Sequence, residues 1–243
     1  EIKVVMEERR LRTEDNPQAQ VHEKQMAAAF QAHPYRRPII GWMNDLENMT
    51  AADARDWYRR WYAPNNAYVI VVGDVNKDAV FRLAEKHYGR IPARALPGRK
   101  PQLEPVQVGI KRLVVKAPAK LPYLSMAWKV PVLRDLHKER EPYALEMLAA
   151  VLDGHEAARF SRNLVRGSKV AVSAGAGYDA TVRGEALFVV SGTPAEGRSV
   201  AELEAALRAE IVRVASEGVS AQELERVKTQ TIAAQVYKRD SMM

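Results

Sequence analysis

Apolar and polar residues repeat with helical spacing over most of the first part of the chain. This spacing predicts helices at residues 1–15, 18–32, 42–47, 51–61 and 76–88. Asn16-Pro17 ends the first of them, because the residue before a proline is driven out of the helical region. Thr50 is suited to cap the helix at 51–61, with Asp53 in its first turn. Residues 67–72 break the pattern, because they are apolar throughout, and this predicts a strand buried on both faces.

Residues 90–109 are rich in proline and glycine and show no hydrophobic period, which indicates a linker that crosses the surface. Beyond them the pattern predicts one sheet of four strands, at 110–117, 122–130, 169–180 and 184–194. It also predicts helices at 138–152, 155–165, 198–216 and 220–240. Ser220 and Glu223 have the spacing of a capping box at the start of the last helix.

This order of elements predicts an α+β fold, with helices packed on one face of antiparallel sheets. We divide the chain into a first portion (1–89), a linker (90–109) and a second α+β portion (110–243).

The composition is that of an ordinary globular protein, with 243 residues, 47% hydrophobic and 28% charged. A chain of this length buries a core without help from disulfides or metals. It contains no cysteine, which excludes a disulfide scaffold, an iron–sulfur centre, a thiol nucleophile and a thiolate zinc site.

The formal net charge is +7, but the positive residues are scattered along the sequence, so we expect no nucleic-acid partner. No apolar run approaches the ~20 residues that span a bilayer, so we expect no membrane partner. The chain opens with Glu1 inside a predicted helix and shows no signal peptide, and we expect it to be a fragment of a longer protein. Its compartment stays open between the periplasm or export and the cytoplasm.

The first predicted helix carries one chemical oddity. On a wheel of about 100° per residue, Glu1 and Glu8 share one face with apolar neighbours, while Glu7 lies outside it. The other members of the shared face are Val4, Val5, Leu11 and Arg12. Buried carboxylates are either paired or bound to metals, since an unpaired one is costly to bury. Either Arg12, four residues after Glu8, pairs with it, or the carboxylates serve a metal.

The histidines give no metal motif of their own. His22, His33, His87, His137 and His155 form no H-x-x-x-H, H-E-x-x-H or H-x-x-E-H set. We interpret them as ordinary polar residues. The sequence also contains no G-x-S-x-G, P-loop or G-x-G-x-x-G motif.

Several stretches, in this order along the chain, resemble one known family. They are Glu1–Glu8 (EIKVVMEE), His33–Tyr35 (HPY) leading to Ile40-Gly41, Met49–Asp53 (MTAAD), Tyr62–Ala67 (YAPNNA) running into Val71–Val75 (VVGDV), and Leu224–Gln230 (LERVKTQ). The chain resembles the pitrilysin/insulinase superfamily of zinc peptidases, the inverzincins, which includes the mitochondrial processing peptidases. The resemblance covers nearly the whole chain and implies a processing-peptidase-like metallohydrolase fold.

In that family two histidines of an H-x-x-E-H helix and a glutamate from a later helix hold zinc. The resemblance makes Glu8 the third zinc ligand and Glu1 a supporting carboxylate seven residues before it. The H-x-x-E-H segment, with its general base, is absent from these 243 residues, and the resemblance implies that it lies upstream. We therefore expect zinc in the intact parent, no bound zinc and no catalytic residue in this chain, and an isolated chain that is inactive.

Family halves that complete the site from the far side carry an arginine and a tyrosine, where this sequence has Val165 and Val172. The resemblance thus implies a bacterial-type zinc endopeptidase acting on peptides or small unfolded proteins, with a second homologous half that supplies the arginine and tyrosine. Its substrate-binding residues stay unknown. The alternative is a non-catalytic structural or assembly subunit of the same superfamily, and an intact upstream H-x-x-E-H would decide against it.

Overall fold

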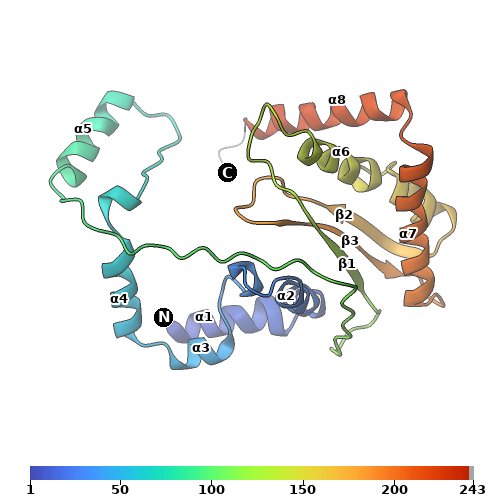
Figure 1. Cartoon of the computed structure of the whole chain (residues 1–243), viewed down its shortest axis with the longest axis horizontal. Coiled ribbons are helices and arrows are strands. Elements are labelled where there is room, and N and C mark those ends of the chain that lie inside the picture. The colour runs from blue at the N-terminus through green and yellow to red at the C-terminus, as the bar shows by residue number, and fades with distance from the viewer. Residues whose placement is uncertain (241–243) are drawn as a thin grey trace.

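The centre of the molecule is a three-stranded antiparallel sheet. A computed structural model describes residues 1–240, so the last three residues of the predicted 110–243 portion lie outside the described residues. The strands are β1 (Leu124–Val130), β2 (Ala171–Gly177) and β3 (Ala186–Pro194), in the order β1-β3-β2 (Figure 1). In the β1–β3 register Met126 lies opposite Val190. Alternate residues of β3 are buried, as expected for a strand with one face on a core.

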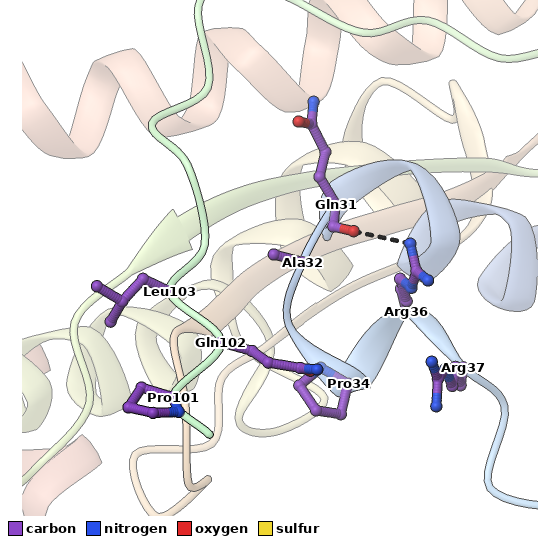
Figure 2. A pocket seen from close by; sticks show the side chains of 8 residues that line it. All are labelled: Gln31, Ala32, Pro34, Arg36, Arg37, Pro101, Gln102 and Leu103. Atoms are coloured by element: carbon purple, nitrogen blue, oxygen red, sulfur yellow. Dashed lines mark hydrogen bonds between the residues drawn. The ribbon is translucent and has the colours of Figure 1, made fainter. Parts of the chain in front are cut away.

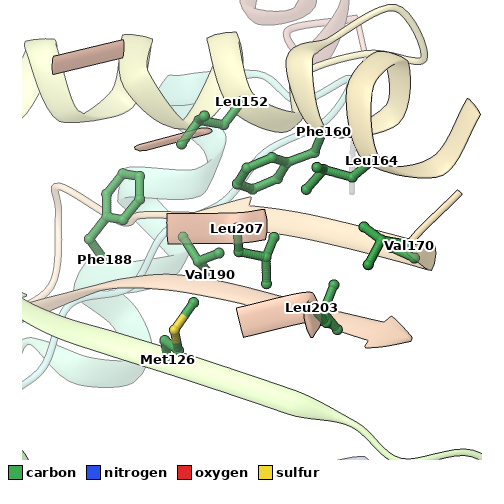
Figure 3. Close-up of a cluster of buried hydrophobic side chains, with 10 residues drawn as sticks. Met126, Leu152, Phe160, Leu164, Val170, Phe188, Val190, Leu203 and Leu207 are labelled. Carbon is green, nitrogen blue, oxygen red and sulfur yellow. The ribbon is translucent and has the colours of Figure 1, made fainter. Parts of the chain in front are cut away.

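Helices from the second half of the chain cover the buried face of this sheet. They are α6 (Glu141–Asp153), a π-helical segment (Ser161–Gly167) and α7 (Val200–Glu217), and α8 (Ala221–Lys238) packs on α6. Side chains of α6, the π segment and α7 meet the strands in one apolar cluster (Figure 3). Its fully buried members include Leu152, Phe160, Val190, Leu203 and Leu207. The α+β class and the antiparallel sheet with packed helices are confirmed.

The first half of the chain is helical. It contains α1 (Ile2–Arg9), a π-helical turn (Arg10–Glu14), α2 (Pro17–Ala29), α3 (Met43–Asn48), α4 (Ala51–Trp61) and α5 (Lys77–Tyr88), with short 3-10 turns at Pro34–Arg36 and Pro64–Asn66. In Figure 1, α2 lies beside the end of β1 and α1 and α3 lie beyond α2, whereas α4 and α5 extend away from the sheet. The division into portions 1–89 and 110–243 stays a prediction, and across it Ser125 Oγ of β1 donates to Gln25 Oε1 of α2 at 2.9 Å. Within the described residues, no helix has both the length and the apolar character needed to cross a bilayer.

Local capping signals predicted the starts of two helices, α4 and α8. Thr50 and Asp53 form a full capping box at α4. At α8 the Ser220 side chain accepts from Glu223 N at 3.2 Å. The second hydrogen bond of the predicted capping box, from the Ser220 backbone N–H to the Glu223 side chain, does not form. The Glu223 carboxylate instead receives two hydrogen bonds from the buried Arg159, at 2.7 and 3.1 Å. A buried guanidinium without a counter-charge costs more free energy than an exposed backbone N–H at a helix start that is left without a side-chain cap. The helix predicted at 155–165 is also displaced, because residues 155–158 form turns.

Two predicted strands are wrong. Residues 67–72 and 110–117 pair with no strand of the described chain, so the predicted four-stranded sheet has three strands. The first segment is also exposed rather than buried, with Tyr68 and Ile70 at 95% and 83%. A β-strand requires hydrogen bonds to a neighbouring strand, so an apolar segment without such a neighbour stays irregular. The second segment is attached by side chains, since Arg112 forms a bidentate ion pair with Glu204 of α7 at 2.9 Å.

The segment at 90–109 has no helix or strand, as predicted for a linker, but one of its residues is firmly anchored. The Glu104 side chain is 3% exposed. Its carboxylate accepts from the backbone N–H groups of Gln31 and Ala32 at 2.8 Å, from that of His33 at 2.9 Å, and from Lys129 Nζ of β1 at 2.9 Å. Burial opposes ionisation of this carboxyl, but these donors outweigh it and hold the pKa of Glu104 at about 2.

The motif His33–Tyr35 docks the hairpin between β2 and β3. Tyr35 Oη accepts from Arg183 N at 2.8 Å, and His33 Nδ1 accepts from Tyr35 N at 3.2 Å. Gly184 packs so closely on the His33 ring that a Cβ there would overlap Nε2. The motif therefore ties the helical first half to the sheet.

We expect Glu104→Gln to destabilise the chain by ~1–3 kcal/mol at pH 7, since an amide cannot accept from every donor that the carboxylate satisfies. Because the folded pKa lies below the ordinary 4.5, the stabilisation is present above about pH 4.5 and is lost as the pH falls toward 2. Urea unfolding followed by circular dichroism at pH 7 and near pH 2.5 measures both effects.

The control is Glu225→Gln, which removes an exposed carboxylate paired with Lys228 and should change stability by ~0.5 kcal/mol or less. Equal unfolding midpoints for the Glu104 variant and the unchanged chain at pH 7 would contradict this account.

Candidate metal-ligating helix

Glu8 lies in the last turn of α1, half exposed to solvent. Its side chain is 41% exposed, and Oε1 is 3.0 Å from Arg12 Nη2, an ion pair between residues four apart on the helix. Arg12 is itself 74% exposed, so the pair is a surface contact of small energetic value. The pairing with Arg12 predicted from the sequence is therefore present, but it leaves the Glu8 carboxylate open to solvent.

Glu1 stands at the N-cap of α1 and is exposed. Its side chain makes no capping hydrogen bond, while its carbonyl accepts from the N–H groups of Val4 and Val5. Seven residues of helix place it about 10 Å along the axis from Glu8, on the same face. The structure thus aligns the two carboxylates without bringing them into contact.

The face of the helix that carries Glu1 and Glu8 is largely open to solvent in the described chain. Val4 and Leu11, which share the face of Glu1 and Glu8, are 64% and 72% exposed. Glu7 is exposed and pairs with Arg10. The buried side of α1 is occupied by a charged residue, Arg9, which a hydrophobic wheel assigns to the surface.

Arg9 is 5% exposed and holds α1 against two other segments. Its Nη1 donates to Glu23 Oε2 of α2 at 2.8 Å and to the carbonyl of Gly41 at 2.9 Å. Its Nη2 donates to Glu23 Oε1 at 3.3 Å, and the guanidinium lies 5.9 Å from the centre of the Trp42 ring. Sequence reasoning missed this pair, because its partners are fourteen residues apart on different helices. The one sequence feature that could have indicated the pair is Glu23 itself, a charged residue in the alanine-rich α2.

The donors around Glu8 are too few for a metal site on their own. Within residues 1–240, no group of three or more histidine, aspartate or glutamate side chains is placed to hold a metal ion. Zinc takes four ligands in proteins, and an open carboxylate suits one of those positions. Glu8 therefore fits the part of a single ligand, and the described residues do not complete the set.

The positions aligned with the family's arginine and tyrosine carry no chemistry here. Val165, in the π-helical segment after α6, packs against the apolar core, and Val172 of β2 is 55% exposed. Neither side chain has a hydrogen-bonding group.

A surface pocket lies elsewhere, between the turn at Pro34–Arg36 and the segment at 101–103 (Figure 2). Its volume is about 430 Å³, and Arg36 and Arg37 reach its rim. Arg36 Nη1 donates to the carbonyl of Gln31 at 2.8 Å. None of the site residues predicted from the sequence lines this pocket.

Comparison with known proteins places these features among peptidases. The family model described as "Peptidase M16 inactive domain" matches residues 48–231. The zinc protease PqqE of Helicobacter pylori is 32% identical over 201 residues, which are 80% of this chain and 44% of that protein. The chain thus spans less than half the length of this curated relative.

Solved structures show the same fold. The crystal structure of a protease from Helicobacter pylori has a TM-score of 0.88 at 27% identity, covering 99% of this chain and 58% of that one. The periplasmic protease PqqL from Escherichia coli has a TM-score of 0.69 at 18% identity, covering 96% of this chain and 25% of that one.

The contrast between Glu8 and Glu23 predicts opposite effects on stability. Glu8→Gln removes a surface pair and should change the free energy of unfolding by ~0.5 kcal/mol or less. Glu23→Gln leaves the buried Arg9 without a full counter-charge and should cost ~3–5 kcal/mol. Chemical unfolding of both variants of the 243-residue chain measures the difference. A large loss for Glu8→Gln would mean that Glu8 is a structural residue.

Proposed function

The chain belongs to the peptidase M16 inactive-domain family, and from that premise we propose that it is part of a zinc endopeptidase to which it contributes Glu8 as one zinc ligand. The observation that carries the proposal is the setting of Glu8. It is a half-exposed carboxylate on an uncovered helix face, where it contributes little to stability. A residue with this setting is free to bind a metal that other residues also hold.

The length of the relatives supports a shared site. PqqE of Helicobacter pylori, named a zinc protease, is more than twice as long as the matched region. In the proposed enzyme the other zinc ligands and the general base come from residues outside these 243, in an H-x-x-E-H helix. Zinc bound there would activate a water molecule for attack on a peptide carbonyl. Glu8 would supply negative charge to the metal, and Glu1, on the same helix face and two turns away, would support the site electrostatically.

A second homologous half completes the proposed enzyme. Val165 and Val172 offer no donor for a substrate carbonyl, so the arginine and tyrosine of the family come from that half, on the same longer chain or on a partner. The proposed substrates are peptides or small unfolded proteins.

A non-catalytic role in an assembly is the second candidate. The observation that favours it is the description of the matched family as an inactive domain. The match covers residues 48–231, however, and the helix with Glu8 lies before it. The sequence upstream of Glu1 separates the candidates, since a degenerate H-x-x-E-H would favour the assembly role.

We expect the 243-residue chain alone to keep no stoichiometric zinc after dialysis and to cleave no peptide, because one carboxylate cannot fill a four-coordinate site. Metal analysis and a fluorogenic peptide assay with and without a chelator test this. Stoichiometric zinc, or chelator-sensitive hydrolysis, would show that folding brings further ligands to Glu8.

In the full-length protein, Glu8→Gln should strip zinc and abolish hydrolysis, because it keeps the size of the side chain and removes the anionic ligand. Glu1→Gln should cost about 10–100-fold in affinity or activity, as supporting groups around a metal do. Glu7→Gln, about 100° away on the helix, is the matched control and should leave zinc content unchanged. Zinc stoichiometry and peptide turnover are measured on all three. Loss of zinc from the Glu7 variant with retention in the Glu8 variant would overturn the assignment.

A further inference from the structure

Arg9, whose guanidinium is buried, follows Glu8 directly in sequence and leaves the helix in a different direction. Arg9 is 5% exposed, while the Glu8 side chain is 41% exposed. Successive residues of a helix are rotated by about 100°, so whatever fixes Arg9 also fixes the direction in which Glu8 leaves the helix. The contacts of Arg9 come from two segments outside α1: Glu23 on α2, and the Gly41 carbonyl with the Trp42 ring.

The π-helical turn that follows adds a further contact to Arg9. Asp15 N donates to the carbonyl of Arg10 at 2.8 Å, an i→i+5 hydrogen bond. Such bonds bring residues five apart onto one face, whereas in an α-helix they are about 140° apart. Glu14 Oε1 accordingly lies 3.6 Å from Arg9 Nε, a buried atom that makes no hydrogen bond within the described residues.

We infer that Arg9 is a positioning residue, which sets the rotation of α1 through its bidentate pair with Glu23 and its bond to Gly41 and so directs the Glu8 carboxylate toward the metal. This inference rests on the proposed function. It adds a residue that contacts neither metal nor substrate, about 100° around the helix from the ligand.

The need for such a residue follows from the packing of α1. The helix has eight α-helical residues, and Arg9 is the only one of them that is buried. Its apolar residues are exposed (Val4) or half-buried (Ile2, Val5 and Met6). Apolar contacts therefore leave the rotation of the helix weakly defined. A planar guanidinium defines this rotation through two hydrogen bonds to a carboxylate and one to a backbone carbonyl. A lysine keeps the positive charge but cannot form the bidentate pair.

The chain contains a matched control at a distance. Arg159 is 8% exposed, makes a bidentate pair with Glu223 at 2.7 and 3.1 Å, and donates to the carbonyl of Gly218 at 3.0 Å. Its partners have the same chemistry as those of Arg9, a glutamate and a glycine carbonyl. It belongs to the α8 side of the molecule, away from α1.

The experiment compares Arg9→Lys and Arg159→Lys in the full-length protein, with Glu8→Gln beside them. Zinc affinity is measured by competition with a chromophoric chelator at a temperature where circular dichroism shows each variant folded, and melting temperatures are recorded in parallel. We expect both lysine variants to have lower melting temperatures than the unchanged protein. Only Arg9→Lys should lose zinc affinity, by about tenfold or more. Glu23→Asp, which shortens the partner, should reproduce the loss and serves as the second variant where Arg9→Lys does not fold.

Unchanged zinc affinity in a folded Arg9→Lys or Glu23→Asp variant would overturn the inference and leave Arg9 a structural residue. So would an equal loss in Arg159→Lys, because the effect would then follow stability alone. If Glu8→Gln retains zinc, the proposed function fails and the role of Arg9 fails with it.

Discussion

The buried carboxylate of Glu104 holds three parts of the chain together. It comes from a segment without helix or strand, binds the backbone where α2 has just ended, and accepts from a lysine of β1. Four donors around one buried charge fix that carboxylate in a single position. The helices of the first half are thereby held at the end of the sheet, and the docking of His33–Tyr35 on the β2–β3 hairpin depends on the same loop.

Beyond this anchor, the first half buries only a few apolar side chains within the described residues, among them Phe30 and Leu46, and charged contacts add to them. The second half has a continuous apolar core beneath the sheet. The charged contacts of the first half include Arg9 with Glu23, Glu104 with Lys129, and cations near the ring of Trp42. Buried ionic contacts define orientation better than they add stability. Such a half is suited to holding one exposed side chain in a set direction, which is what we propose for Glu8.

The sequence allowed good prediction of whatever depends on neighbouring residues. The start of α4 follows from Thr50 and Asp53, and the end of the first helix from Asn16-Pro17, because these signals act within a single turn. It failed where a partner decides the structure. Residues 67–72 have the composition of a strand but pair with no strand in the described chain. The Glu223 carboxylate accepts from Arg159 instead of completing the predicted capping box. The burial of Arg9 was missed for the same reason, since its partners Glu23, Gly41 and Trp42 lie on other segments. The choice of Glu8 and Glu1 came from resemblance, and the fold alone does not single them out.

The exposed segment at 67–72 makes this polypeptide prone to self-association. Tyr68 to Val72 are consecutive, apolar, β-branched or aromatic, uncharged and free of proline, and each is exposed. Short segments of that composition, when open to solvent, stack on copies of themselves into cross-β assemblies. Nothing in the flanking turn at Pro64–Asn66 or at Gly73 adds a charge directly beside the run. While this segment is open to solvent, the polypeptide is therefore liable to self-association through it.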